Sequence, residues 1–454
     1  MAGIHCGVVS LDLFSKPLQQ DDIIGGYYTS KGCSSTLNSS RDLEFIFEKS
    51  SDHYSDISKS FLELDLQVVK ANGDPVEHYK PNPAYVEDKT VEPILKGADF
   101  PVAPINNIAH SLWARQRLMI NEQSVSAHNY AAYESQFKYL FSNKQSTKDC
   151  TLKGLTGWRT DKPGFFDKET NPALESSCQE LCKDGKVFKV ICNPTFDLAS
   201  SNRPIPNGSS MRMVFTRNSD QFVLMSFKGN ENYKLLIKDA TYHLWRVILS
   251  PNAQMHLERS LALHPTVHHV KSLVMKPVNI EQGKRDLTID SVFSSNYIPE
   301  RLIVTMVRQE AYRGQYNFNP FYFQHFKVNE ISINALGRSD HQYFAWDSED
   351  GINQTVIPYK NFCDFLGDHS LCDSNFGIDK VAHENGNFFC VFDLSPNSSY
   401  KSGVASFDRQ GSISLQMRFE GNGIAHNAVL LICGVFDNIY HQDINRTFTS
   451  PYIF

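Results

Sequence analysis

Residues 61–70 read Phe-Leu-Glu-Leu-Asp-Leu-Gln-Val-Val-Lys. Leucine or valine occupies every second position from 62 to 68, so an extended chain carries its apolar side chains on one face and its polar side chains on the other. This pattern predicts a β-strand with one face against a core and the other in water. The same alternation occurs in both halves of the chain, at residues 43–47, 211–215 and 413–419.

Three other runs are mostly apolar instead of alternating, which is typical of strands that are covered on both faces. They span residues 245–249, 302–307 and 429–433. Turn-forming dipeptides such as Asn72-Gly73 and Asn422-Gly423 separate the strands. The chain is therefore predicted to be all-β.

Helix is expected in only two places. In residues 129–142, an apolar stripe recurs at helical spacing and consists of Tyr130, Tyr133, Phe137, Leu140 and Phe141. An aromatic stripe of this kind is far more often core packing than a ligand site, and we interpret it as packing. Residues 253–263 form the second expected helix, where the first half of the chain gives way to the second.

The chain is long enough for two large β domains. It has 454 residues, of which 41% are hydrophobic and 21% charged, and all-β domains commonly reach about 200–250 residues each. A division near Ser250-Pro251 gives each half room for an eight-stranded jelly roll. We therefore predict two tandem jelly rolls, residues 41–250 and 251–454, preceded by a polar N-terminal arm, residues 1–40, that orders against a partner.

Two long polar stretches, residues 144–186 and 337–387, are predicted to be loop excursions from these domains. Loops of such length inside compact domains are normally functional or interface-forming. No internal repeat is legible in the residues themselves, so the duplication is inferred from chain length and strand content.

The charge balance argues against a surface that binds nucleic acid. Lys and Arg number 44 against 50 Asp and Glu, which gives a net charge of -6, and no long basic run occurs. Residues 1–15 have no basic region before an apolar stretch and make a poor secretory signal. The longest apolar run, residues 428–436, is too short to cross a bilayer as a helix. We expect cytosolic synthesis, no direct nucleic-acid contact and no membrane-spanning segment.

Ten cysteines are scattered along the chain, which favours reduced, mostly buried thiols over a disulfide framework. Cys178, Cys182 and Cys192 raise the question of a zinc site, but a second pair with matching spacing and a nearby histidine are both missing. No metal is expected here, and the role of Cys178 and Cys182 stays open.

The densest group of histidines is His264, His268 and His269, near His256. Pro265 disrupts helical register, and adjacent His268 and His269 would point to opposite faces of a strand. Packed or surface histidines are therefore a better interpretation than a metal site.

Asp347, Glu349 and Asp350 before Gly351 resemble part of a calcium loop, but the later bidentate carboxylate is missing, which favours a solvated acidic turn. The chain also lacks a phosphate-binding loop, a nucleophile elbow, a His-Glu-x-x-His helix and an EF-hand. Catalytic, cofactor-binding and metal-site residues are accordingly all predicted to be none, and the chain is predicted not to be an enzyme.

Short motifs follow one another over nearly the whole chain. In the first half they are Leu11-Asp12-Leu13-Phe14, residues 43–47, Pro104-Ile105-Asn106-Asn107, Leu112-Trp113 and Thr156-Gly157-Trp158 with Asp161; in the second they are Ile298-Pro299-Glu300-Arg301, Gly314, Asn319-Pro320-Phe321-Tyr322-Phe323 and Phe326. Together they resemble the major capsid proteins of Polinton (Maverick) elements, and the Asn-Pro-Phe segment is the most specific part. His264-Pro265-Thr266 departs from the Tyr-Pro pair of that family.

The resemblance implies a double jelly-roll capsid protein, similar to the adenovirus hexon lineage. Two jelly rolls would stand side by side, and three chains would form a homotrimeric, pseudo-hexagonal capsomer of an icosahedral shell. Such a ring needs a heterologous interface, which the long excursions would supply. Implied partners are copies of this chain, neighbouring capsomers and the minor (penton) capsid protein of the same element. The implied location is the virion capsid, with synthesis in the host cytoplasm and nuclear assembly as an option.

Two alternatives stay open. A jelly-roll glycan-binding or attachment protein would group aromatic platforms and carboxylates on one loop face, to which Trp158, Trp346 and Asp347 could contribute. A glycan hydrolase would use paired carboxylates at a domain seam, and nothing in the spacing favours one.

Overall fold

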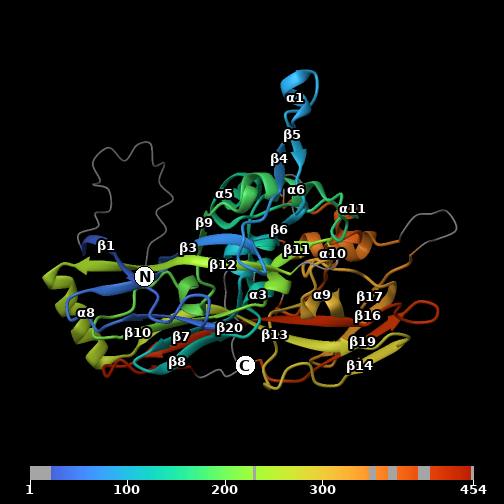
Figure 1. Cartoon of the computed structure of the whole chain (residues 1–454). Helices are drawn as coiled ribbons and strands as arrows, with labels where there is room; N and C mark the ends of the chain where they lie inside the picture. The colour runs from blue at the N-terminus through green and yellow to red at the C-terminus, as the bar shows by residue number, and fades with distance from the viewer. Residues whose placement is uncertain (1–21, 229–231, 347–353, 367–375, 397–408, 451–454) are drawn as a thin grey trace, which may run out of the picture.

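Two β-sandwiches follow one another along the chain and share one strand order (Figure 1). The computed structural model describes residues 22–228, 232–346, 354–366, 376–396 and 409–450. The first sandwich comprises the sheets β1-β12-β3-β9 and β2-β10-β7-β8, and the second comprises β13-β20-β15-β18 and β14-β19-β16-β17. When the eight strands of each sandwich are numbered one to eight along the chain, both sandwiches have the same two sheet orders, 1-8-3-6 and 2-7-4-5. This is the jelly-roll order, so the prediction of two tandem eight-stranded jelly rolls is confirmed.

We name each sheet after its first strand and the two sandwiches the first and second jelly roll. The first contains β1 (Ile23–Gly32), β2 (Asp42–Phe47), β3 (Tyr54–Lys70), β7 (Trp113–Ile120), β8 (Gln123–His128), β9 (Phe188–Cys192), β10 (Met211–Arg217) and β12 (Tyr233–Leu249). The second contains β13 (Thr266–Ile280), β14 (Asp286–Ile289), β15 (Arg301–Arg308), β16 (Val328–Ala335), β17 (Arg338–Tyr343), β18 (Cys390–Asp393), β19 (Ile413–Phe419), β20 (Ala428–Gln442) and β21 (Phe448–Thr449), which adds to β20.

The alternation of apolar and polar residues builds the core as predicted. Leu64 and Leu66 on β3 are fully buried, and Asp65 between them on the opposite face is partly exposed. Leu66 lies opposite Ile237 of β12, which is also buried. Strand β19 repeats the pattern in the second jelly roll, where Leu415 is fully buried.

Both predicted helices are present. Helix α3 (Ala131–Ser142) follows β8, and α8 (Pro251–Leu263) links the two jelly rolls. Helix α8 begins at Pro251, two residues before the predicted start, because Ser250 caps its N-terminus by accepting a hydrogen bond from the Ala253 amide and Pro251 occupies the first turn.

The two predicted excursions are partly helical, which the sequence analysis did not predict. Residues 144–186 carry α4 (Gln145–Thr147), a π-helical turn (Lys148–Leu152), α5 (Lys153–Thr156), α6 (Pro172–Glu180) and a 3-10 turn (Lys183–Gly185). Residues 337–387 contain β17, α10 (Val356–Phe365) and α11 (Lys380–Glu384), while their positions 347–353 and 367–375 lie outside the described residues. The remaining short elements are α2 (Ile108–Ser111), a 3-10 turn (Asp197–Ser200), α7 (Asp220–Val223), α9 (Gln309–Arg313), and the paired strands β6 (Val102–Pro104) and β11 (Leu224–Ser226).

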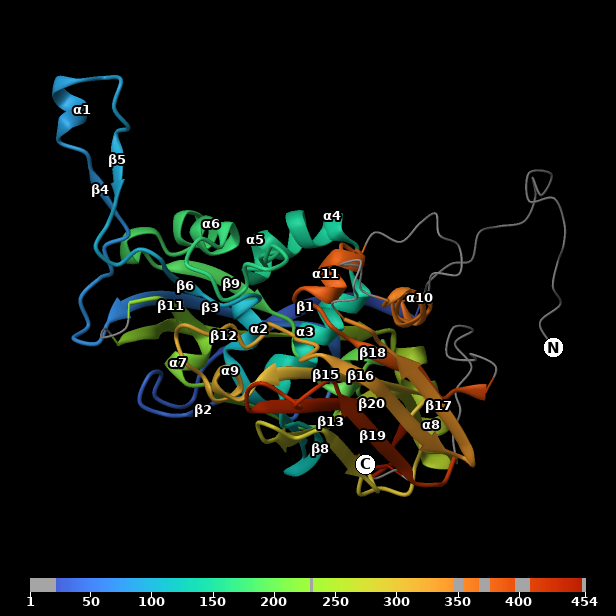
Figure 2. The ribbon, with the colours of Figure 1, turned by 90° about the vertical axis from the view of Figure 1, so that its right-hand side faces the viewer.

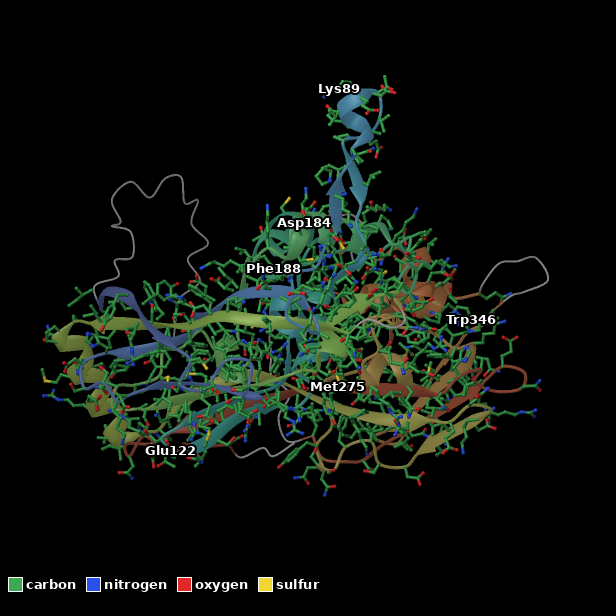
Figure 3. All side chains as sticks on the ribbon, viewed as in Figure 1. Lys89, Glu122, Asp184, Phe188, Met275 and Trp346 are labelled. Atoms are coloured by element: carbon green, nitrogen blue, oxygen red, sulfur yellow. The ribbon has the colours of Figure 1, made fainter. Side chains whose placement is uncertain are left out.

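A third excursion, missed in the sequence, forms a spike between β3 and β6. It consists of β4 (Tyr79–Pro81), α1 (Ala84–Glu87) and β5 (Ile94–Lys96) and stands clear of both jelly rolls in two views (Figures 1 and 2). Lys89 lies near its far end (Figure 3). Val86 is 78% exposed and Leu95 is 47% exposed, so the spike buries little apolar surface of its own.

The prediction of an N-terminal arm is wrong for residues 23–32. These residues form β1, which pairs with β12 along its length and places Tyr28 opposite Trp245. Residues 1–21 lie outside the described residues. The division near residue 250 stays a proposal, supported by the four main sheets, each of which draws its described strands from one half of the chain.

Candidate functional site

The cysteine pair of the first excursion is buried where α6 packs against β6. Cys178 and Cys182 are fully buried, and the Cys178 thiol lies 2.9 Å from the Val102 carbonyl oxygen. Cys192 is buried on β9. The eight cysteines in the described part of the chain are free thiols, and no three His, Cys, Asp or Glu residues gather there in a metal-binding group.

The histidines of β13 point to opposite faces, as the strand geometry predicts. His268 is 2% exposed, and burial lowers its pKa to about 4. His269 instead faces out, and its Nε2 lies 3.0 Å from the Asp437 carboxylate. His264 ends α8. The geometry therefore does not bring the three histidines together.

The residues suggested for a glycan platform do not form one in the described structure. Trp158 and Trp346 are each 4% exposed. Trp346 stacks on His325 at 3.6 Å between ring centroids and donates its indole N–H to the Val328 carbonyl at 2.6 Å. Asp347 and the rest of the acidic turn lie outside the described residues. Both tryptophans are thus occupied in packing.

Helix α3 lies between the two jelly rolls and fills the seam with aromatic rings. Phe137 is fully buried and contacts Phe323 and Phe389 of the second jelly roll, with ring centroids 5.5 and 5.4 Å apart. One turn away, Tyr133 stacks on Tyr312 at 5.9 Å. The predicted packing stripe is confirmed, and its partner proves to be the other jelly roll. The sequence could not reveal that partner.

Two of the sequence motifs, those of Asp161 and Asn319, meet at this seam. Asp161 of the Gly-Trp-x-x-Asp segment accepts a hydrogen bond from the Asn319 side chain at 3.2 Å and lies 3.3 Å from Arg159. The Asn319 backbone amide donates to Asp167 at 2.6 Å, and its side-chain oxygen accepts from the Phe321 amide at 2.9 Å. Asn319 is fully buried. The Asn-Pro-Phe segment therefore locks the first excursion onto the second jelly roll.

We expect Asn319→Ala to lower the free energy of unfolding by about 2–4 kcal/mol, because it leaves the Phe321 amide and one Asp161 oxygen unpaired inside the protein. Urea unfolding of the two proteins measures the difference. Asn422→Ala, at an exposed turn, is the matched control and should change stability by less than about 0.5 kcal/mol. Equal losses of stability at the two positions would contradict the stabilising role of the Asn319 hydrogen bonds.

A buried polar cluster extends the seam. His128 lies between two carboxylates, with Nδ1 2.6 Å from Glu134 and Nε2 3.3 Å from Asp197. Asp197 also accepts hydrogen bonds from Ser272 and Tyr440 of the second jelly roll, at 2.9 and 3.0 Å. Burial alone would lower the pKa of His128, but the two carboxylates outweigh it and raise the pKa to about 10.

This cluster places a pair of carboxylates, which the hydrolase alternative needs, beside a cavity of about 270 Å³ at the seam. Both carboxylates pair with His128 and are under 10% exposed. A glycosidase needs two carboxyl groups free to face the scissile bond from opposite sides. The geometry therefore favours a structural role for Glu134 and Asp197.

Because the folded-state pKa of His128 lies above its usual 6.5, its contribution to stability is complete below pH 6.5 and is lost as the pH rises towards 10. We expect this histidine to make stability fall by about 1 kcal/mol per pH unit across that window. Urea midpoints at pH 6, 8 and 9.5 measure the slope. His128→Gln should reduce this dependence of stability on pH. An unchanged slope in that variant would show that His128 is not its source.

Large apolar side chains are exposed on several elements, with α8, β17 and α10 among them. Helix α8 leaves Met255 and Leu263 48% and 77% exposed, and it lies at one end in Figure 1. Tyr343 on β17 and Ile357 on α10 are 63% and 72% exposed. Surface leucines and isoleucines are ordinary when scattered, but groups of them mark contact surfaces.

The fold thus defines the class of the protein: it is a double jelly roll, with helical excursions above the seam. Among solved structures, a chain of the Sputnik virophage aligns with TM-score 0.61 and 11% identity over 99% of this chain and 93% of that chain. The mavirus major capsid protein aligns with TM-score 0.55 and 9% identity over 99% and 95%. The Faustovirus major capsid protein aligns with TM-score 0.54 and 8% identity over 94% and 92%.

A relative by sequence comes from an animal. An uncharacterised protein of Caenorhabditis elegans is 24% identical over 412 residues, which cover 89% of this chain and 91% of that protein. No family model matches the chain. No helix in the described part of the chain is both long and apolar enough to cross a membrane.

Proposed function

We propose that this chain is the major capsid protein of an icosahedral particle and that three copies form a pseudo-hexagonal capsomer. The observation that carries the proposal is the double jelly roll itself, which aligns with two viral major capsid proteins over at least 92% of both partners. Alignment over whole chains covers the seam and its excursions as well as the sandwiches. The role proposed is structural, without a catalytic site.

We further propose that the chain belongs to a Polinton (Maverick) element. The support is the series of motifs from Leu11 to Phe326, together with the contact between two of them, Asp161 and Asn319, at the seam. The further partners would then be neighbouring capsomers and the minor (penton) capsid protein of the same element, and the location would be the virion capsid after synthesis in the host cytoplasm.

A mildly acidic shell protein suits this role, since a net charge of -6 lets capsomers approach one another without strong repulsion. The proposal does not include direct contact with the genome.

Native mass spectrometry at micromolar concentration tests the proposal. We expect a species of three times 51.5 kDa. A chain that stays at 51.5 kDa under these conditions would contradict the capsomer. A glycan array run on the same sample tests the attachment alternative, which predicts saturable binding to a defined glycan.

A further inference from the structure

The seam between the two jelly rolls is not completely filled. The cavity of about 270 Å³ beside His128 lies there, and we call it the seam cavity. Its walls come from α3, the 3-10 turn Asp197–Ser200 with the residues just before it, the β13 sheet and α10. Protein interiors seldom leave spaces much larger than a water molecule, so a cavity of this size where two domains meet is a candidate ligand site.

One wall of the seam cavity is a single face of helix α3. Glu134, Phe137, Lys138 and Phe141 all line the cavity. They are three or four residues apart, so they lie on the same side of the helix. Phe137 is fully buried, whereas Lys138 is exposed. The helix therefore presents aromatic rings and one cation to the same space.

The opposite wall is the outer face of the β13 sheet. Leu273 and Arg301 lie on either side of Val435 in the strand register, and all three line the cavity. The Arg301 guanidinium lies 4.9 Å from the centre of the Phe365 ring, which belongs to α10. This wall also combines apolar side chains with a cation, so both jelly rolls contribute the same two kinds of group.

The charges of the lining favour an anion. Four cations face two carboxylates there: His128, Lys138, Lys271 and Arg301 against Glu134 and Asp197. His128 carries its proton at neutral pH because its pKa is raised to about 10, and it pairs with both carboxylates. Lys271 pairs with two carboxylates outside the lining, Glu300 and Asp437. Without Lys271, three cations against two carboxylates still leave a net charge of +1, in a chain whose net charge is -6.

Lys138 is the cation that lacks a partner. Its side chain makes no hydrogen bond or ion pair within the described part of the chain, although the Asp197 carboxylate is near enough to act on it. Burial by the atoms around it lowers the pKa of Lys138, while the side chain stays accessible to solvent. An ammonium group that is accessible and yet desolvated lies in a hollow of the surface. Such a group gains free energy when an anion joins it there.

We propose that the seam cavity binds a single-chain organic carboxylate, whose hydrocarbon tail lies among the aromatic rings and whose carboxylate meets Lys138 and Arg301. Phe141 and Phe365, whose ring centroids are 5.5 Å apart, are two of those rings. An apolar cavity of roughly 150 Å³ holds a benzene molecule. The larger seam cavity therefore suits a chain of roughly ten carbons, and it is too small for a lipid with two long chains.

This ligand would connect the two jelly rolls, because α3 belongs to the first and the β13 sheet to the second. A ligand that binds only the folded chain raises its stability by mass action. The inference does not depend on the proposed capsomer, since each chain contains the whole cavity.

Three probes with the same chain length test the inference on the full, unmodified protein: decanoate, 1-decanol and decylammonium. Isothermal titration calorimetry measures their affinities. We expect one decanoate to bind per chain with a Kd of about 10–100 µM. The alcohol and the ammonium should each bind at least about tenfold more weakly, because neither brings a negative charge to Lys138. At a hundredfold excess over Kd, decanoate should raise the midpoint of thermal unfolding by about 2–3 °C.

Two variants locate the bound probe. Lys138→Gln should weaken decanoate binding about tenfold and leave 1-decanol binding unchanged, because it removes the charge and keeps the apolar walls. Leu273→Trp should abolish the binding of both, since Leu273 is partly exposed in the cavity and a larger ring there fills the space of the tail. Lys284→Gln is the matched control, because Lys284 is exposed at a turn of the second jelly roll. It should bind decanoate as the wild type does.

The comparison of the three probes needs no substitution, so it decides the matter even where a variant fails to fold. Absence of decanoate binding at millimolar concentration would overturn the proposal. Equal affinities for decanoate and decylammonium would overturn it as well, because the cations of the lining would then play no part. Decanoate binding that is unchanged in a folded Leu273→Trp chain would place the ligand elsewhere and would also refute the assignment.

Discussion

Phe137→Ala is expected to lower the free energy of unfolding by about 3–5 kcal/mol, which is the usual cost of removing a buried phenylalanine ring from a packed core. Phe137 is fully buried and lies within 6 Å, centroid to centroid, of Phe141, Phe323 and Phe389. These rings come from both jelly rolls, so the cavity left by the substitution would open at the seam.

Urea unfolding of the full chain measures this effect. Tyr85→Ala is the matched control, because Tyr85 lies on the spike and contacts Lys89 at 4.3 Å from its ring centroid, away from both sandwiches. Its substitution should change stability by less than about 1 kcal/mol. A loss of under 1 kcal/mol for Phe137→Ala would mean that the seam contributes little to the fold.

Gly314→Ala is expected to cost about 2–5 kcal/mol, from a strained backbone and a collision together. Gly314 ends helix α9 with a φ of 87°. A Cβ at this position would lie 2.9 Å from the backbone nitrogen of Phe222 in the first jelly roll. The methyl group would therefore push the two jelly rolls apart.

Gly283→Ala separates the two causes. Gly283 has a similar φ of 81°, but an added Cβ would meet no atom within 4 Å. This variant should lose only the stability that backbone strain at a positive φ removes, about 1–2 kcal/mol. If thermal and urea unfolding give the same loss for both glycines, the close approach of the jelly rolls at Gly314 is not what selects glycine there.

The strands that could be predicted from the sequence are those that bury one face in a core and expose the other. Alternation identified β3 and β19 because one face of each strand packs into a core and the other faces out. Strand β1 escaped notice because almost all of its residues are exposed in the single chain, so its side chains show no period of two. An edge strand with so few buried side chains gives no such signal.

The excursions were located correctly but not resolved into helices. Most of their helices are three to five residues long, which is too short to repeat a helical period. The spike was missed for the same reason, since β4 and β5 have three residues each. The contact between Asp161 and Asn319 spans 158 residues of sequence, and no local pattern can reveal a pairing of that range.

Electron microscopy of the purified chain in negative stain would show directly whether three copies assemble into a capsomer. We expect class averages with a hexagonal or triangular outline, six sandwich-sized densities around the centre and three projecting spikes in side view. Uniform two-lobed particles of single chains, at concentrations where a capsomer should be complete, would contradict it.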